Sequence, residues 1–152
     1  MYSVFFEKPM SFDCKLSVSA CYMEYQGRYL FLKRSPSSSQ GNTWGVPAGK
    51  VKKGETALQA VIREIFEETQ VTLVSQKTHE VGKLWIEIPC FQYKYFLFSY
   101  KLSTAVSVKL NHENSDFKWC TFEEAQDLKL MMGAKEALIY FKKISNQDHG
   151  KQ

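Results

Sequence analysis

Three glutamates, Glu64, Glu67 and Glu68, stand three residues and one residue apart in the chain. On a helix, at about 100° per residue, their side chains gather on one side within roughly a 100° arc. Exposed carboxylates this close repel one another by roughly 0.2–0.5 kcal/mol per pair. Their oxygens suit a hard divalent cation, Mg²⁺ or Mn²⁺, which usually keeps waters and substrate phosphates as further ligands. The spacing therefore indicates a metal site or, as the alternative, a solvated acidic face with an Arg63–Glu67 ion pair.

The sequence around these glutamates predicts a helix that follows a Gly/Lys loop. Thr56 and Gln59 have the spacing of a capping box at a helix start. Apolar residues then recur at helical spacing and would form the buried side of the helix: Leu58, Val61, Ile62 and Ile65. The glutamates fall on another side. The loop and the helix together occupy residues 49–71.

This stretch resembles the Nudix box, the signature of the Nudix hydrolases. The fixed positions that match are Gly49, Glu55, Arg63, Glu64, Ile65, Glu67, Glu68 and Val71. One position differs, because the family has Gly where this chain has Gln70. A Gly just past a helix end usually supplies a left-handed residue. Another residue there costs on the order of 1 kcal/mol, unless the helix ends in a different way.

The resemblance implies hydrolysis of a nucleoside diphosphate linked to another group, with Mg²⁺ as cofactor or Mn²⁺ in its place. Such a metal lowers the pKa of a bound water and so supplies a nucleophile near neutral pH. The implied metal ligands are the side chains of Glu64, Glu67 and Glu68 and the backbone carbonyl of Ala48. Arg63 would orient the carboxylates by ion pairing. Glu55 would support that network or bind the metal through water.

The family often takes one more carboxylate from outside the box, as a metal ligand or as the general base. Glu113 lies six residues before Trp119, a spacing that resembles the acidic position of several nucleotide-hydrolysing members. The alternative is an acidic residue of a surface loop, and Asp116 is the next candidate. His112 could also act as a base, but a lone loop histidine more often faces solvent.

Basic residues that precede the acidic helix in the sequence suit a phosphate-bearing substrate: Lys33, Arg34, Lys50, Lys52 and Lys53. Of these, Arg34 and Lys50 are the candidates for substrate binding, against the alternative of ordinary solubilising charge. Trp44 could stack on a nucleobase, although a Trp beside Gly and Pro more often packs into the core. Aromatic residues that could equally stack on a base or pack inside are Phe12, Tyr22, Trp44, Trp85 and Tyr93.

Composition favours one globular domain over residues 1–152, with 44% hydrophobic and 24% charged residues. The net charge of +4 is mild and scattered, which argues against a nucleic-acid-binding protein. No apolar run approaches the roughly 20 residues that span a bilayer. The first residues lack the features of a signal peptide, and the four cysteines resemble reduced thiols. We therefore expect a cytoplasmic protein without a membrane partner, as a monomer or homodimer.

The order of the expected elements is strands, helix, strands, helices, which is typical of an α+β or layered α/β domain. Strands are expected at 15–25, 28–33, 71–74, 81–88, 91–102, 106–110 and 116–120, the first two as a hairpin. Residues 1–13 are expected to be an irregular lead-in with at most a short strand, and 91–102 a central strand. Helices are expected at 121–129 and 134–144, and 146–152 as a flexible polar tail. The resemblance implies an α/β/α sandwich with a mixed sheet and a loop–helix–loop catalytic motif.

The expected substrate is a small nucleotide, and two enzymatic readings remain open. The first is a nucleoside triphosphate, cleaved to the monophosphate and pyrophosphate. The second is a dinucleoside polyphosphate of the diadenosine tetraphosphate type, or an RNA 5′ end. The stretch from His112 to Trp119 loosely resembles diadenosine tetraphosphate hydrolases and some nucleoside triphosphate pyrophosphohydrolases. A third reading, from another class, is a catalytically silent nucleotide-binding protein, which would be expected to lose box carboxylates.

Overall fold

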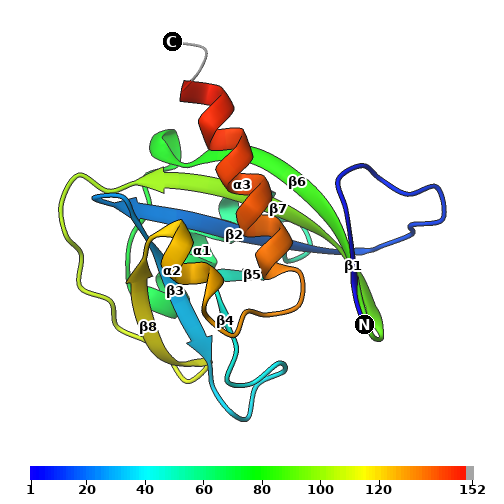
Figure 1. Ribbon diagram of the computed structural model, residues 1–152, viewed down its shortest axis with the longest axis horizontal. Coiled ribbons are helices and arrows are strands. Elements are labelled where there is room, and N and C mark those ends of the chain that lie inside the picture. Colours follow the sequence, from blue (N-terminus) through cyan, green and yellow to red (C-terminus); the bar gives the residue numbers. More distant parts are fainter. Residues whose placement is uncertain (150–152) are drawn as a thin grey trace.

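The computed structural model describes residues 1–149, and its strands form one mixed sheet of eight strands. The strands are β1 (Ser3–Phe5), β2 (Leu16–Tyr25), β3 (Arg28–Arg34), β4 (Trp44–Gly45), β5 (Ala48–Lys50), β6 (His79–Ile88), β7 (Phe91–Lys101) and β8 (Asn114–Cys120). The helices are α1 (Ala57–Thr69), α2 (Phe122–Gln126) and α3 (Ala134–His149), with a short 3₁₀ turn η1 (Ser75–Lys77). Figure 1 shows α3 across one face of the sheet and α1 behind it, which confirms the expected sandwich with a mixed sheet.

Two apolar clusters, one on each face of the sheet, form the core. Along β2, Cys21 and Met23 belong to the cluster on the α1 side, whereas Tyr22 belongs to the cluster on the α3 side. The alternation arises because successive side chains of a strand point to opposite faces. In β7, Leu97 and Phe98 divide in the same way, and β7 pairs with both β6 and β2. The expected central strand, covered on both faces, is therefore confirmed.

One edge of β2 is shared by two strands, and this arrangement brings the loop before α1 into the sheet. The β2–β3 hairpin is paired only at its tip, at Glu24–Tyr29 and Tyr25–Arg28. Further back, β5 pairs antiparallel with residues 18–20 of β2. The strand β3 diverges and pairs instead with β8 and β4. The start of the Nudix-like stretch is thus fixed as a sheet strand, and α1 follows directly from it.

The helix α1 begins and ends as the sequence predicts. Both hydrogen bonds of the capping box between Thr56 and Gln59 are present. At the other end, Gln70 takes the left-handed conformation, with φ 64°, and its backbone N–H donates to the Phe66 carbonyl at 2.8 Å. The turn is therefore the one that a Gly would supply. The substitution leaves the geometry of the helix end unchanged and costs conformational free energy instead.

Replacing Gln70 with Gly is expected to raise the free energy of unfolding by about 1 kcal/mol, because Gly adopts the left-handed region without strain. Urea unfolding measures the change, and hydrolytic activity should stay the same. Gln76→Gly is the matched control, since Gln76 is not among the residues of positive φ. That control should lower stability. An unchanged or lower stability of the Gln70 variant would contradict the strain argument.

Two expected strands are not strands in the structure. Val71 and Leu73 are buried against the α1-side cluster, but residues 71–74 pair with no strand of the described chain. Residues 106–110 also pack there with their apolar side chains, and a single backbone bond ties the segment to α1, from the Lys109 N–H to the Thr69 carbonyl at 3.0 Å. In both segments the alternating apolar residues are buried or half-buried, but no neighbouring strand of the described chain pairs with the backbone. The periodicity of the sequence does not show whether such a partner exists.

The chain ends differ from expectation in smaller ways. The lead-in contains β1, which pairs with β6. The helix α2 ends at Gln126, three residues earlier than expected, and Leu130 then forms a bridge to Trp44. The helix α3 continues through residues 146–149, where a polar tail was expected, and 150–152 lie outside the described residues. Within the described part of the chain, each helix is too short or too polar to cross a membrane.

Candidate active site

The guanidinium of Arg63 ties α1 to the loop that precedes it. Its Nε and one terminal nitrogen donate to the two carboxylate oxygens of Glu55, at 2.7 and 2.8 Å. The same terminal nitrogen donates to the Lys50 carbonyl at 3.0 Å. The other donates to Glu64 at 2.8 Å and to Glu67 at 3.3 Å. These donors hold the pKa of Glu55 down at about 2. Arg63 therefore contacts three carboxylates at once.

Glu68 lies behind this network and is almost entirely buried, at 3% exposure. Burial raises its pKa well above the usual range, and the nearby negative charges of Glu64 and Glu113 raise it further. The Ala48 backbone amide and the positive charge of Arg34 partly oppose this rise. Burial also raises the pKa of Glu64, more than its contact with Arg63 lowers it. The carboxylates of Glu64, Glu68 and Glu113, which come from two distant segments of the chain, therefore lie close enough to repel one another.

Gly49 allows the Glu64 carboxyl group to lie directly against the backbone of β5. A Cβ atom at position 49 would stand 2.0 Å from the Glu64 carboxyl carbon and 2.3 Å from one of its oxygens. Real Cβ atoms do not approach other heavy atoms so closely, so any side chain there would displace the carboxylate. The glycine at the start of the Nudix-like stretch is therefore required by space rather than by its backbone conformation.

The donor set of this site fits a divalent cation. The described residues hold no group of three His, Cys, Asp or Glu side chains already arranged as a metal cage, and Glu64 and Glu67 are both paired with Arg63. Glu68, however, is buried beside two other carboxylates, Glu64 and Glu113. Such an arrangement is costly for a protein alone. Carboxylate and backbone oxygens are the ligands that Mg²⁺ prefers, and its charge would offset the repulsion.

The candidate substrate-binding residues lie in three different environments. Arg34 is half-buried, acts on Glu68, and donates through Nε to the Ser39 carbonyl at 3.0 Å. Lys50 has an exposed side chain next to the Arg63 network. Trp44 is 7% exposed and packs in the α3-side cluster, with the Lys118 ammonium 5.0 Å from its ring centroid. Trp44 therefore packs in the core, the second of the two roles considered for it, and its burial argues against stacking on a base.

A serine-rich loop holds Glu113 in place, a role that the sequence did not reveal. The Ser35 backbone N–H donates to the Glu113 carbonyl at 2.9 Å, and the Ser38 hydroxyl donates to the same oxygen at 3.3 Å. The Ser35 hydroxyl donates to the His112 carbonyl at 2.7 Å. Asp116 is exposed and accepts from the adjacent Phe117 N–H.

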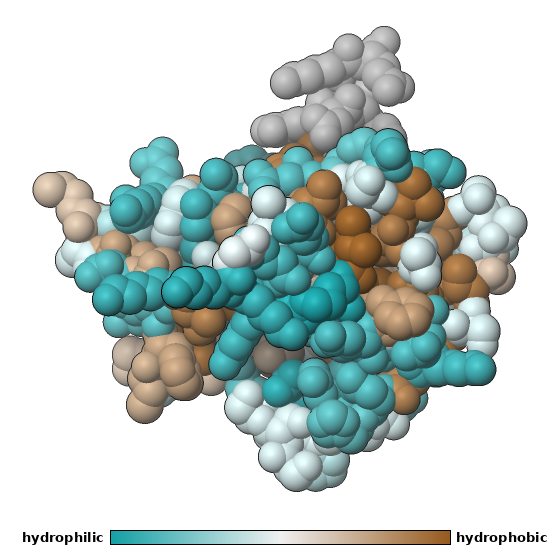
Figure 2. All heavy atoms as spheres, turned by 180° about the vertical axis from the view of Figure 1, so that it is seen from behind, coloured by the Kyte–Doolittle hydropathy of each residue, from teal (hydrophilic) through white to brown (hydrophobic). Residues whose placement is uncertain are grey.

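Figure 2 shows the α1 side of the molecule, where hydrophilic side chains form a band across the middle between hydrophobic patches. On this side, α1 exposes the face that carries Glu67, whose side chain is 46% exposed. Glu68 and Glu64 lie deeper, on the side of the helix that faces β5. A mixed sheet between helices, with carboxylates on a loop–helix–loop beside basic residues, is the arrangement of a phosphoanhydride hydrolase.

Comparison with known proteins agrees with this class. The NUDIX domain family matches residues 15–141. The bis(5′-nucleosyl)-tetraphosphatase (asymmetrical) of Caenorhabditis elegans is 32% identical over 108 residues, which cover 68% of this chain and 76% of that protein. The chain therefore belongs to the Nudix hydrolase family, whose members cleave the pyrophosphate bonds of nucleotides.

Solved structures of similar fold give the same result. The crystal structure of a MutT protein from Methanosarcina mazei has a TM-score of 0.75 and 22% identity, and the match covers 88% of this chain and 94% of that one. The C. elegans Ap4A hydrolase in a binary complex has a TM-score of 0.65 and 25% identity, with 88% and 99% coverage. The expected fold is thereby confirmed, and the family match confirms the expected enzyme class.

Proposed function

We propose that this enzyme hydrolyses dinucleoside polyphosphates of the diadenosine tetraphosphate type, with Mg²⁺ as cofactor. The observation that carries the proposal is the 32% identity to a relative named as an asymmetrical bis(5′-nucleosyl)-tetraphosphatase. The position of Glu113 beside Glu64 and Glu68 is compatible with it, because the sequence around Glu113 resembles this enzyme class as well as some nucleoside triphosphate pyrophosphohydrolases. The nucleoside triphosphate reading, which the sequence placed first, becomes the second candidate.

In this proposal the carboxylates of the α1 site hold the metal. Its ligands are Glu64, Glu67, Glu68 and the backbone carbonyl of Ala48. When bound, the metal lowers the pKa of a water and neutralises charge on the phosphate oxygens. Arg63 keeps the carboxylates oriented through its bonds to Glu55 and Glu64. Arg34 and the exposed Lys50 are the cations available to the substrate phosphates.

Glu113 is the candidate general base. Its side chain is half-buried, comes from outside α1, and acts on both Glu64 and Glu68. A carboxylate in this position would accept the proton of the attacking water at one of its Oε atoms, while the Ser35 loop holds its backbone. The water oxygen would form a new bond to phosphorus as the bond from that phosphorus to the bridging oxygen breaks, and the second nucleotide would leave with the bridging oxygen and its electron pair.

Glu113→Gln is expected to lower kcat about 100-fold, because amide oxygen is a poor proton acceptor and general bases contribute about 10² to 10⁴. KM should change little, since the substituted group contacts the water rather than the nucleotide. Asp116→Asn is the control and should retain the wild-type rate, because Asp116 is exposed and makes only a local bond. Equal rates for both variants would exclude Glu113 as the base.

A product assay tests the substrate directly. The full chain would be incubated with diadenosine tetraphosphate, nucleoside triphosphates, ADP-ribose and 5′-triphosphorylated RNA, each with Mg²⁺ and with a chelator. The expected result is equimolar ATP and AMP from diadenosine tetraphosphate, only with metal. Pyrophosphate released faster from a nucleoside triphosphate would favour the second candidate. No hydrolysis of any member with Mg²⁺ or Mn²⁺ would overturn the proposal.

A further inference from the structure

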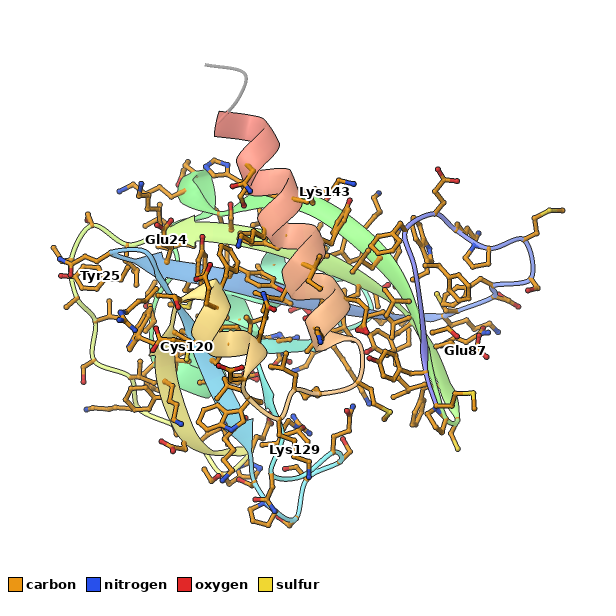
Figure 3. All side chains as sticks on the ribbon, viewed as in Figure 1. Glu24, Tyr25, Glu87, Cys120, Lys129 and Lys143 are labelled. Atoms are coloured by element: carbon orange, nitrogen blue, oxygen red, sulfur yellow. The ribbon has the colours of Figure 1, made fainter. Side chains whose placement is uncertain are left out.

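A cavity lies at the opposite end of β2 from the strand β5. Its volume is about 550 Å³, and it is lined by the ends of β2 and β7, by η1, by the start of β6 and by α3. Figure 3 shows Glu24 of this cavity at the end of β2 beside α3, while Glu87 marks the far end of the sheet. None of the lining residues belongs to the carboxylate site. The cavity is therefore a separate feature of the fold.

Aromatic residues with free hydroxyl groups form the floor of the cavity. Tyr22 is 2% exposed and stacks on Phe141, with ring centroids 4.0 Å apart, and Tyr29 is 8% exposed and packs edge-on against both. Among the described residues neither hydroxyl has a hydrogen-bond partner, and both tyrosines line the cavity. Buried tyrosine hydroxyls usually find a partner. These two therefore present unused donors to an occupant.

Burial keeps both floor hydroxyls protonated. It raises the pKa of Tyr29 to about 12, with a smaller effect from the nearby charge of Glu24, and it raises the pKa of Tyr22 as well. As neutral phenols they can donate to an anion or to a sugar oxygen. The stacked rings leave little freedom to turn away, because Tyr22 and Phe141 are almost parallel, at 6°. The donors are thus fixed in direction.

Basic residues from three separate elements converge on the rim. They are Lys77 of η1, His79 of β6 and Lys101 of β7. Among the described residues none of them forms a salt bridge. Glu24 faces the same space and is also unpaired there. Cations at a cavity mouth attract an anion, while one carboxylate among them selects for a ligand that also carries hydrogen-bond donors.

We propose that this cavity is a second binding site, for a phosphorylated small molecule of nucleoside monophosphate size. The phosphate would lie between Lys77 and Lys101. The sugar hydroxyls would donate to Glu24, and the Tyr22 and Tyr29 hydroxyls would donate to the ligand from the floor. The volume falls within the roughly 300–1,000 Å³ of typical ligand sites. Glu24 is its one carboxylate, so the site is suited to binding and not to the hydrolytic reaction.

A titration of the full chain with AMP in a chelator, followed by two-dimensional amide NMR, tests the site apart from any metal-dependent reaction. Saturable shifts are expected at Lys77, Ser99 and Ser103, which line the cavity. The double variant Lys77→Ala/Lys101→Ala should weaken binding at these positions about tenfold or more. The matched control, Lys8→Ala/Lys135→Ala, removes two exposed lysines elsewhere and should bind as the wild type does.

Two further arms keep the outcome clear. Tyr22→Phe removes only the hydroxyl and keeps the stacked ring, and it should weaken AMP binding severalfold with an otherwise unchanged spectrum. Inorganic phosphate and adenosine alone should each bind more weakly than AMP. Shifts confined to residues 49–71, or equal affinity in both lysine variants, would overturn the proposal. Phosphate binding as tight as AMP binding would overturn the nucleotide part of it.

Discussion

Glu68→Gln is expected to remove almost all hydrolytic activity and at the same time to make the metal-free protein more stable. Loss of activity should reach about 10³-fold or more, because a metal ion contributes several kcal/mol and each 1.4 kcal/mol is about tenfold. Stability should rise because Glu68, at 3% exposure, is buried beside Glu64 and Glu113. Glutamine has the same shape and can still accept from the Ala48 amide, but it carries no charge.

The pH dependence of this gain follows from the direction of the pKa shift. The folded state raises the pKa of Glu68, so its contribution to stability is full below the unfolded pKa and is lost as pH rises through the folded pKa. The wild type and the Gln variant should therefore melt at similar temperatures near about pH 4. At neutral and alkaline pH the variant should melt higher, by about 2–4 °C for each 1 kcal/mol relieved.

Added Mg²⁺ supplies the second half of the test. It should raise the melting temperature of the wild type, because a ligand that binds only the folded state stabilises it. The effect should be much smaller for Glu68→Gln. Glu123→Gln is the control, since Glu123 is exposed and forms a 3.4 Å ion pair with Lys142, far from the carboxylate site. A Glu68 variant with more than about a tenth of the activity would contradict its assignment as a ligand.

The sequence alone predicted those parts of the site that depend on neighbouring residues. The capping box, the helical spacing of the carboxylates and the Arg63 contact to Glu67 all lie within one helix, where spacing fixes direction. The β2–β3 hairpin could be predicted for the same reason, because its turn involves neighbouring residues. Even the departure at Gln70 could be interpreted, since a left-handed residue was one of the two expected outcomes.

Long-range features could not be read in the same way. The link between Glu113 and the serine-rich loop is one of them, because Ser35 and Ser38, which donate to the Glu113 carbonyl, stand 78 and 75 positions earlier in the chain. A serine-rich loop has no local pattern that names its partner. Residues 71–74 alternate like a strand, yet no strand of the described chain pairs with them. A strand needs both buried side chains and a neighbouring strand that pairs with its backbone, and the periodicity of the sequence indicates only the burial.

Gly49→Ala is expected to lower activity about 100-fold while changing stability by less than about 1 kcal/mol, because a misplacement of about 1 Å can cost that much in rate. The new Cβ would overlap the Glu64 carboxyl group at 2.0 Å, so that group must move. It is 13% exposed and bonded to Arg63 at 2.8 Å, and a shift would break this contact. Because only the end of a flexible side chain moves, the fold should survive.

Gly27→Ala provides the reverse case. Gly27 has φ 79° and open space around an added Cβ, so the substitution brings strain without displacing any neighbour. It should cost about 1 kcal/mol of stability and leave the rate unchanged. Both variants are measured for kcat at saturating Mg²⁺ and for urea unfolding. Gly49→Ala should lower kcat and keep the stability, whereas Gly27→Ala should lower the stability and keep kcat. If Gly49→Ala keeps the wild-type rate, the carboxylate position seen beside β5 is not the one that catalysis uses, and Glu64 must turn away from Gly49 when the metal binds.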